Sequence, residues 1–157
     1  MKTLILYATK HGATRKIAER ISGYIEGAVL HDLKNSGIPA ISEFDCVIIG
    51  SSVYAGAIRR EAKAFISKNA GDLKDKKTGL FLSGMSRSGE DKLFEGNFPA
   101  DLLKTVCVTS LLGGVFDPEK AGKMERFIMK IATKKTGYAD TVDEGKIERF
   151  TRILKEV

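Results

Sequence analysis

Short, almost uninterrupted apolar runs alternate along this chain with longer segments in which apolar residues recur every three or four positions. The short runs have the length and composition of β-strands, and they cover residues 3–8, 28–33, 45–50, 77–82 and 105–112. The runs 3–8 and 45–50 are apolar enough to predict strands that are buried on both faces. The longer segments have the period of amphipathic helices, and they cover about 13–25, 59–69, 121–135 and 147–154. Strands that alternate with helices form right-handed βαβ units, so the pattern predicts a doubly wound, three-layer α/β fold with a parallel sheet.

Length and composition indicate how many domains the chain forms and which cellular compartment it suits. The 157 residues suit a single domain over 1–157, and 43% hydrophobic residues can fill one core. The two cysteines, Cys46 and Cys107, lie in apolar runs, so we interpret both as buried thiols in a reducing compartment. No run has the roughly 20 apolar residues of a membrane helix, and none resembles a signal peptide, so we expect a cytoplasmic protein.

The loop after the first strand has the features of a phosphate site. In doubly wound sheets, ligands bind beyond the carboxyl ends of the strands, where the strand order reverses. This loop leads directly into a helix, whose amino terminus presents free N–H groups and a partial positive charge. Glycine lets the backbone bend tightly there, and threonine adds hydroxyl donors. The candidate residues are Thr9, Lys10, His11, Gly12, Ala13 and Thr14.

Other phosphate-handling sites do not fit the sequence. A P-loop needs Gly-Lys-Ser/Thr, and a dinucleotide loop needs two or three spaced glycines, whereas this loop has only Gly12. A phospho-acceptor domain would need acidic residues after the first and third strands, which here end in Ala8-Thr9 and Gly50-Ser51. We also find no pattern of a catalytic triad, a carboxylate pair or a metal-ligand cluster, which fits a protein whose cofactor carries the chemistry.

The loops after the third and fourth strands have residues that can hold a flat aromatic ligand. Tyr54 offers a ring for stacking, and Gly56 allows the backbone to come close. The later loop offers backbone groups to the other side of such a ligand. The candidate residues are Ser51, Ser52, Val53, Tyr54, Ala55 and Gly56 in the earlier loop, and Ser83, Gly84 and Met85 in the later one.

The spacing Thr9-x-x-Gly12-x-Thr14 after a first strand resembles the phosphate loop of flavodoxins, and the loop around Tyr54 resembles the loop beside their flavin ring. The resemblance spans essentially the whole chain and implies a flavodoxin-like sandwich with five parallel strands in the order 2-1-3-4-5. It implies one flavin mononucleotide (FMN), with its phosphate in the first loop and its ring between the two later loops. It also implies that a peptide within Tyr54-Ala55-Gly56 can rotate to accept a hydrogen bond from the reduced ring.

The C-terminal third resembles one branch of that family, which includes the menaquinone-dependent protoporphyrinogen oxidase of heme synthesis. This resemblance rests on Gly113-Gly114, the run Phe127–Lys130, Asp140-Thr141 and the opening Met1–Leu6. Two main flavin-dependent roles stay open: a carrier that passes electrons between redox partner proteins, and an oxidase of protoporphyrinogen that delivers electrons to a quinone. An accessory flavodoxin-like oxidoreductase with another small substrate also stays open. A flavin-free interaction module is the alternative from another class.

Charge bears on the partners. The net charge of +6 favours an anionic partner, but no basic stretch interleaved with aromatics predicts nucleic-acid binding. The helix expected at 121–135 places Met124, Phe127, Ile128 and Ile131 on one apolar stripe. Basic residues surround this stripe, namely Lys120, Lys123, Arg126, Lys130, Lys134 and Lys135. We interpret it as a helix that packs on the core and has a solvated basic face. The alternative is peripheral contact with the inner face of an anionic membrane, near a quinone.

Overall fold

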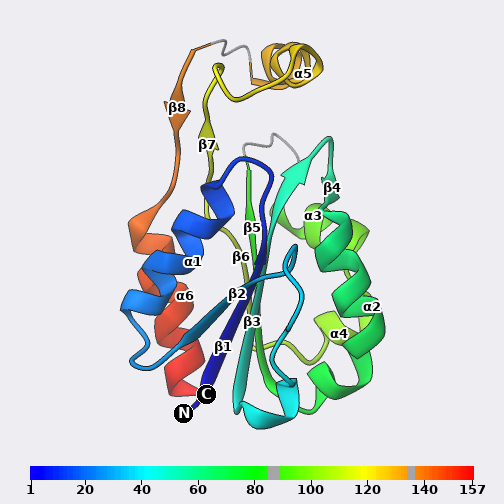
Figure 1. The fold of residues 1–157 in the computed structure, drawn as a ribbon, viewed down its shortest axis with the longest axis vertical. Helices are drawn as coiled ribbons and strands as arrows, with labels where there is room; N and C mark the ends of the chain where they lie inside the picture. The colour runs from blue at the N-terminus through cyan, green and yellow to red at the C-terminus, as the bar shows by residue number, and fades with distance from the viewer. Residues whose placement is uncertain (85–88, 134–136) are drawn as a thin grey trace.

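The structure is a computed structural model that describes residues 1–84, 89–133 and 137–157, and strands and helices alternate along it as predicted (Figure 1). The strands are β1 (Thr3–Ala8), β2 (Val29–Asp32), β3 (Cys46–Tyr54), β4 (Ala57–Ile58), β5 (Lys77–Ser83), β6 (Val108–Leu111), β7 (Val115–Phe116) and β8 (Ala139–Asp140). The helices are α1 (Ala13–Gly23), α2 (Arg60–Lys74), α3 (Glu90–Asn97), α4 (Ala100–Leu103), α5 (Lys123–Thr133) and α6 (Glu144–Glu156), with a 3₁₀ turn, η1 (Ile41–Glu43).

Five strands form the parallel sheet at the centre of the molecule, in the order β2-β1-β3-β5-β6. The short β4 does not join this row, because it pairs antiparallel with the end of β3. With β4 set aside, the row has the predicted order 2-1-3-4-5, so the prediction of a flavodoxin-like α/β fold is confirmed. The order reverses at β1, because β2 lies on one side of it and β3 on the other.

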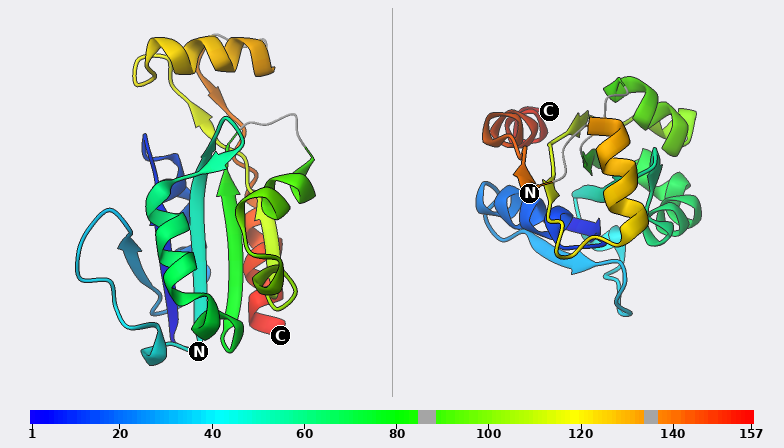
Figure 2. Two further views of the ribbon diagram at one scale, coloured as in Figure 1. Left: turned by 90° about the vertical axis from the view of Figure 1, so that its right-hand side faces the viewer. Right: turned by 90° about the horizontal axis from the view of Figure 1, so that it is seen from above.

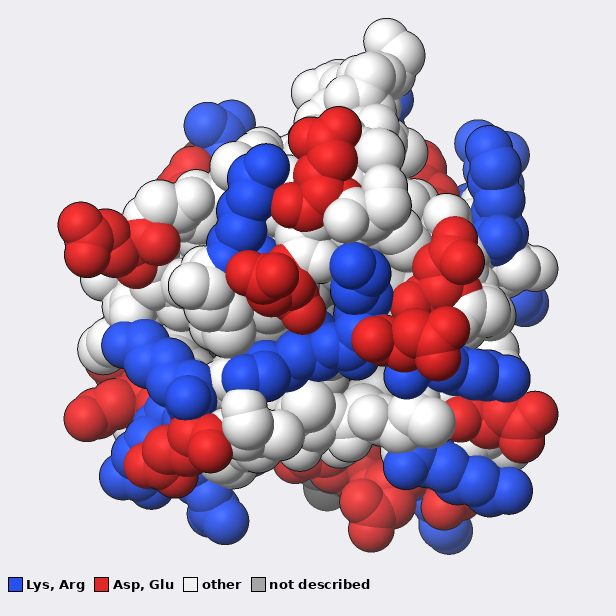
Figure 3. Space-filling model, turned by 90° about the horizontal axis from the view of Figure 1, so that it is seen from below, with Lys and Arg blue, Asp and Glu red and all other residues white. Residues whose placement is uncertain are grey.

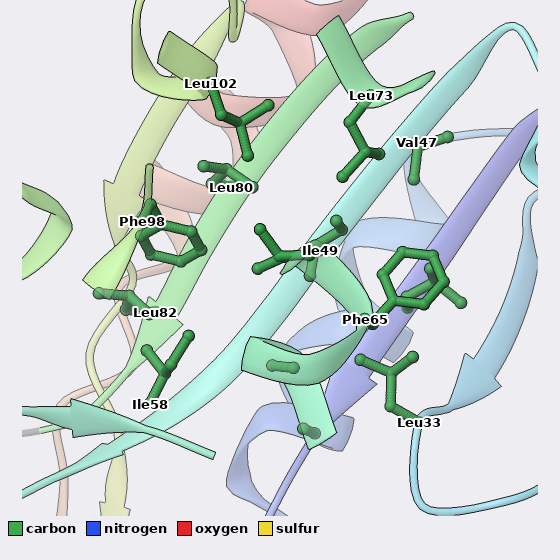
Figure 4. Close-up of a cluster of buried hydrophobic side chains, with 14 of the residues drawn as sticks. Leu33, Val47, Ile49, Ile58, Phe65, Leu73, Leu80, Leu82, Phe98 and Leu102 are labelled. Carbon is green, nitrogen blue, oxygen red and sulfur yellow. The ribbon is translucent and has the colours of Figure 1, made fainter. Parts of the chain in front are cut away.

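Helices cover both faces of the sheet (Figure 1). The face covered by α1 and α6 buries Ile17, Ile21, Ile147, Phe150 and Leu154. The face covered by α2, α3 and α4 buries Phe65, Leu73, Phe98 and Leu102 against strand residues such as Ile49 and Leu80 (Figure 4). Because both faces are covered, the central strands contact apolar side chains on each side, which explains their uninterrupted apolar runs.

The two cysteines are free thiols in different surroundings. Cys46 lies in β3 and is fully buried, and this burial raises the pKa of its thiol to about 11. A thiol with a raised pKa stays protonated at neutral pH and reacts slowly. Cys107 is only half-buried. The prediction that both thiols are buried is therefore correct for Cys46 and wrong for Cys107.

Three parts of the sandwich differ from the sequence prediction. β3 continues through Ser51–Tyr54, for which the sequence predicts a loop. Its serines still pair with β1 and β5, and its last two residues pair with β4, which folds back. α2 continues to Lys74 because its last turn buries Leu73. α3 and α4 were not predicted, since they are only eight and four residues long and bury few side chains each. Helices this short have no long apolar period to detect.

After β6 the chain leaves the sandwich and forms an arm, which consists of β7, α5 and β8, over the carboxyl edge of the sheet (Figure 1). β7 and β8 pair as a two-stranded ribbon, and Figure 2 shows α5 lying across the end of the sheet. Met124, Phe127 and Ile131 are exposed, so the prediction that their stripe packs on the core is wrong. The ribbon places α5 across the end of the sheet and not against either helix-covered face of the sandwich. The side chain of Ile128 and residues 134–136 lie outside the described part of the chain.

Gly50 tests the close packing between β3 and β5. A Cβ at Gly50 would lie 1.9 Å from Cζ of Phe81, whose ring is fully buried. We expect Gly50→Ala to lower the free energy of unfolding by about 1–3 kcal/mol, because the ring must move within a close-packed core. Urea denaturation measures this change.

Gly71→Ala is the matched control, because a Cβ at Gly71 in α2 would meet nothing within 4 Å. Alanine is the better helix former, so this variant should be neutral or more stable by about 0.5–1 kcal/mol. Equal losses of stability in the two variants would contradict the packing argument.

Candidate functional site

The carboxyl ends of β1, β3 and β5 lie side by side, and this brings the three predicted loops together. The strand registers pair Ala8 with Ser51, Ser51 with Leu82, and Ser52 with Ser83. This edge is the end of the sheet that faces the arm (Figure 1). Residues from three separate parts of the sequence therefore border one region.

The loop between β1 and α1 presents donors for an anion. Gly12 has a φ of 94°, in the left-handed region that favours glycine, and its N–H donates to Oγ1 of Thr9 at 2.9 Å. The first intrahelical bond of α1 runs from Lys16 N to Gly12 O at 3.1 Å. The amides of residues 13–15 have no acceptor among the described residues, and no side chain caps the helix. Free N–H groups at a helix amino terminus suit a phosphate.

Thr14 and Ser83 join the first turn of α1 to the end of β5. Their hydroxyl oxygens lie 2.6 Å apart, and both side chains are buried. Each hydroxyl carries one hydrogen, and their mutual bond uses only one of the two. The pair therefore keeps one O–H that can donate to a ligand beside the free amides.

Two adjacent serines in the last part of β3 have different surroundings. Ser51 is buried, and its Oγ donates to Ser52 O at 3.0 Å and accepts from Arg59 N at 2.9 Å. Ser51 thus positions the start of α2. The Oγ atom of Ser52 is buried and has no hydrogen-bond partner within the described ranges. Buried hydroxyls are rarely left without a partner, so Ser52 is a group that a ligand at this edge can satisfy.

Residues 51–56, predicted as one loop, are the end of β3 followed by a tight turn. Val53 and Tyr54 pair with β4, and the turn consists of Ala55 and Gly56. Their φ values are 49° and 78°, and two successive positive values are the pattern of a type I′ turn. Ala55 is the only non-glycine residue with positive φ in the described part of the chain. The turn therefore holds a strained backbone at the rim of the site.

Asn97, at the end of α3, holds this turn, although it is not among the residues that the sequence predicts for the site. Its Oδ1 accepts from Ile58 N at 3.0 Å, and its Nδ2 donates to Gly56 O at 2.9 Å and to Leu93 O at 2.7 Å. The side chain thus fixes the orientation of the Gly56 carbonyl. Asn97 lies 41 positions from Gly56, so no local pattern could indicate the contact.

The arm begins directly at the wall of the site. Gly84 N donates to Gly113 O at 2.9 Å, so an amide that we predicted to face the ligand is already bonded. A Cβ at Gly114 would lie 2.9 Å from Gly84 N, and one at Gly113 would lie 1.9 Å from Thr141 O. These close backbone approaches require glycine at both positions. Met85, also predicted for this wall, lies outside the described residues.

The arm also contacts the loop after β1, through Glu125 of α5. The carboxylate of Glu125 forms an ion pair with Lys10 and accepts from Nε2 of His11 at 2.8 Å. Nζ of Lys10 also lies 4.7 Å from the centre of the Tyr54 ring. Lys10 and His11, both predicted as phosphate ligands, thus face the arm, and a ligand that stacks on this face of Tyr54 must displace Lys10.

The arrangement favours binding of an anionic, partly polar ligand. Free donors come from the amides of residues 13–15, the Thr14–Ser83 pair and the Ser52 hydroxyl. Of the other predicted residues, Thr9 and Gly12 shape the first loop, and Val53–Gly56 form the rim. Within the described ranges, no group of three or more His, Cys, Asp or Glu side chains is arranged to hold a metal ion.

Comparisons with known proteins agree with this architecture. A family model described as a flavodoxin domain matches residues 4–143, and the chain belongs to this family. Flavodoxin 2 from Bacillus cereus superposes with a TM-score of 0.62 at 21% identity, covering 99% of both chains. A short-chain flavodoxin associated with a bacterial microcompartment gives 0.62 at 15% identity, covering 99% of this chain and 98% of that chain. A flavoprotein from Lactobacillus acidophilus, solved in complex with FMN, gives 0.53 at 20% identity, covering 70% and 92%. No curated protein matches the sequence.

Asn97→Ala tests the support of the turn. We expect the free energy of unfolding to fall by about 1–3 kcal/mol, because Ile58 N and Gly56 O lose their partner. Native-state hydrogen exchange should also become faster at the amide of Ile58. Asn69→Ala, which removes a single bond to Phe65 O, is the control and should change stability by less than about 1 kcal/mol. Unchanged exchange at Ile58 in Asn97→Ala would contradict this role.

Proposed function

We propose that this chain binds one FMN at the carboxyl edge of its sheet and transfers electrons through it. The observation that carries the proposal is the set of free amides at residues 13–15, beside the Thr14–Ser83 hydroxyl pair. Membership of the flavodoxin domain family supports it, as does the FMN complex of the Lactobacillus acidophilus flavoprotein. The phosphate of FMN would bind in the loop 9–14, with the ring between Tyr54 and Ser83.

The residues present fit the two ends of FMN. A phosphate carries negative charge, which the free amides and the positive end of α1 stabilise. The unpartnered Ser52 hydroxyl is suited to the polar edge of a flavin ring. Stacking on Tyr54 would displace Lys10 and weaken its ion pair with Glu125. Binding of the ring and the position of the arm are therefore linked in this proposal.

FMN supplies the redox chemistry when bound, because it accepts and releases electrons singly or in pairs. The part of the protein is to bind the group, orient it and exclude water from its buried side. The Ser52 and Thr14 hydroxyls and the free amides do the binding, and the turn held by Asn97 sets the rim. The partner is a redox protein or a quinone.

Thr14→Val tests where the phosphate binds. Valine keeps nearly the volume of threonine but has no hydroxyl, so the O–H that the Thr14–Ser83 pair can donate is lost. A hydrogen bond to a charged group contributes about 1.5–3 kcal/mol, so we expect the Kd for FMN to rise about 10- to 150-fold. Titration by quenching of flavin fluorescence measures this Kd.

Thr151→Val makes the same chemical change in α6, where the hydroxyl bonds only to the carbonyls of Ile147 and Glu148. Its Kd for FMN should stay within about twofold of the native value, since that hydroxyl lies outside the site. Equal affinities of Thr14→Val and native protein would refute the placement of the phosphate. If the native chain binds no FMN, the flavin-free module replaces the proposal.

A second candidate function is the menaquinone-dependent oxidation of protoporphyrinogen. Two of the four sequence features that resemble that branch, Gly113-Gly114 and Asp140-Thr141, meet at the base of the arm. Thr141 N donates to Gly114 O at 2.8 Å, and Gly114 N donates to Oγ1 of Thr141 at 3.2 Å. The arm extends the wall of the site beyond the sheet, which an oxidase of a large substrate can use more readily than a simple carrier.

Turnover separates these two flavin-dependent roles. The assay uses protoporphyrinogen as substrate and a menaquinone analogue as electron acceptor. If the chain is the oxidase, FMN-loaded protein should oxidise the substrate faster than an equal amount of free FMN. The rate of Thr14→Val should then fall in proportion to its loss of FMN. Tight binding of FMN without turnover above the rate of free FMN would leave the electron carrier as the function.

A further inference from the structure

The outward side of α5 is an apolar stripe that the rest of the protein does not cover. Met124 is 70% exposed, and Phe127 and Ile131 are each 63% exposed. Their spacing of three and four residues places them on one side of the helix. Tyr138, which precedes β8 in the same arm, is also exposed. Large apolar side chains in such a group on a folded protein indicate an interaction surface.

Charges on α5 are divided between its two sides. Glu125 turns inward to Lys10 and His11, and its side chain is only 12% exposed. The basic residues of the helix, Lys123, Arg126 and Lys130, are exposed, as are Glu119 and Lys120 in the turn before it, whose opposite charges offset each other. None of the ion pairs between described residues includes them. The surface of α5 that faces solvent is therefore both apolar and positively charged.

The opposite end of the molecule differs from this surface. Figure 3 shows the amino-terminal edge of the sheet, where Lys and Arg side chains alternate closely with Asp and Glu. Neighbouring charges of both signs largely cancel there, whereas the cations of α5 stand beside exposed apolar groups. An anionic surface would therefore be attracted to the arm in preference to the opposite edge.

We propose that the exposed surface of α5 binds an anionic lipid bilayer. A bilayer offers negatively charged headgroups above an apolar interior, which matches cations and large apolar side chains on one helix surface. A second copy of the chain would bring the same cations and repel the first, because each chain carries a net charge of +6. α5 has 11 residues, and no helix in the described part of the chain is long and apolar enough to cross a membrane.

Binding of α5 to a bilayer would turn the carboxyl edge of the sheet toward the lipid, because the arm lies over that edge (Figure 2). In this one step the inference rests on the proposed FMN site. The electron acceptor would then be an apolar quinone dissolved in the bilayer, which the arm brings near the site. Binding to lipid itself needs no flavin, so it can be tested separately.

Sedimentation with vesicles tests whether α5 binds an anionic bilayer. We expect the native chain to bind vesicles of phosphatidylcholine mixed with anionic phosphatidylglycerol, to bind phosphatidylcholine alone weakly, and to dissociate as salt is added. Lys123→Gln with Lys130→Gln should reduce the partition coefficient about 30-fold, since each lysine near an anionic surface contributes about 1 kcal/mol. Lys63→Gln with Lys68→Gln on α2 makes the same change of charge elsewhere and should have little effect. Equal losses in both double variants, or no binding by the native chain, would overturn the proposal.

The chain has no tryptophan, so a single introduced one reports its own surroundings. Phe127→Trp should shift its emission to the blue on anionic vesicles and become shielded from acrylamide. Val157→Trp is the control, since Val157 is exposed at the end of α6 and should show neither change. A blue shift in Val157→Trp alone would show that another surface contacts the lipid and would refute lipid binding by α5. Both measurements are repeated with and without FMN. This separates a failure of the proposed lipid binding by α5 from a failure of the proposed flavin site.

Discussion

The parallel pairing of β1 with β3, and of β3 with β5, is the constraint on which the site depends. It sets the carboxyl ends of three strands side by side, so that the first turn of α1, the Ser52 hydroxyl and Ser83 face one region. Helices on both faces maintain this register, since a shift of one residue would turn every buried side chain of a strand to the wrong face. The same packing leaves the amides at the start of α1 exposed to a ligand.

The arm adds to this sandwich a helix with two chemically different sides. Its inner side contacts the site, because Glu125 pairs with Lys10 and His11 beside the Tyr54 ring. Its outer side presents cations and apolar side chains to the surroundings. Since Lys10 contacts both Glu125 and Tyr54, a ligand on that ring competes with the attachment of the arm. A change at the site therefore bears on the surface that we propose for lipid.

Much of the fold could be predicted from the sequence because the information is local and repeated. The five parallel strands each have an apolar run, of which β1, β3 and β5 are the most buried, and α1, α2 and α6 each have an apolar period. The first loop was also predictable, since Gly12 and the start of α1 are neighbours in sequence. The periodicity of α5 was correct as well, but the inference that its stripe packs on the core was not. Periodicity shows which side chains share a face and does not show whether another element covers that face.

By itself, the sequence determined the chain order of the five parallel strands and of the helices with an apolar period, together with the glycine turn that leads into α1. Strand, turn and helix preferences of this kind act over a few neighbouring residues. Only the tertiary structure decided the turn at Ala55–Gly56, because this turn depends on Asn97 from α3. It also decided that the Gly84 amide donates its hydrogen bond to the Gly113 carbonyl. It also decided that α5 lies over the site with its apolar side exposed. Each of these outcomes depends on contacts between residues distant in sequence, which packing alone brings together.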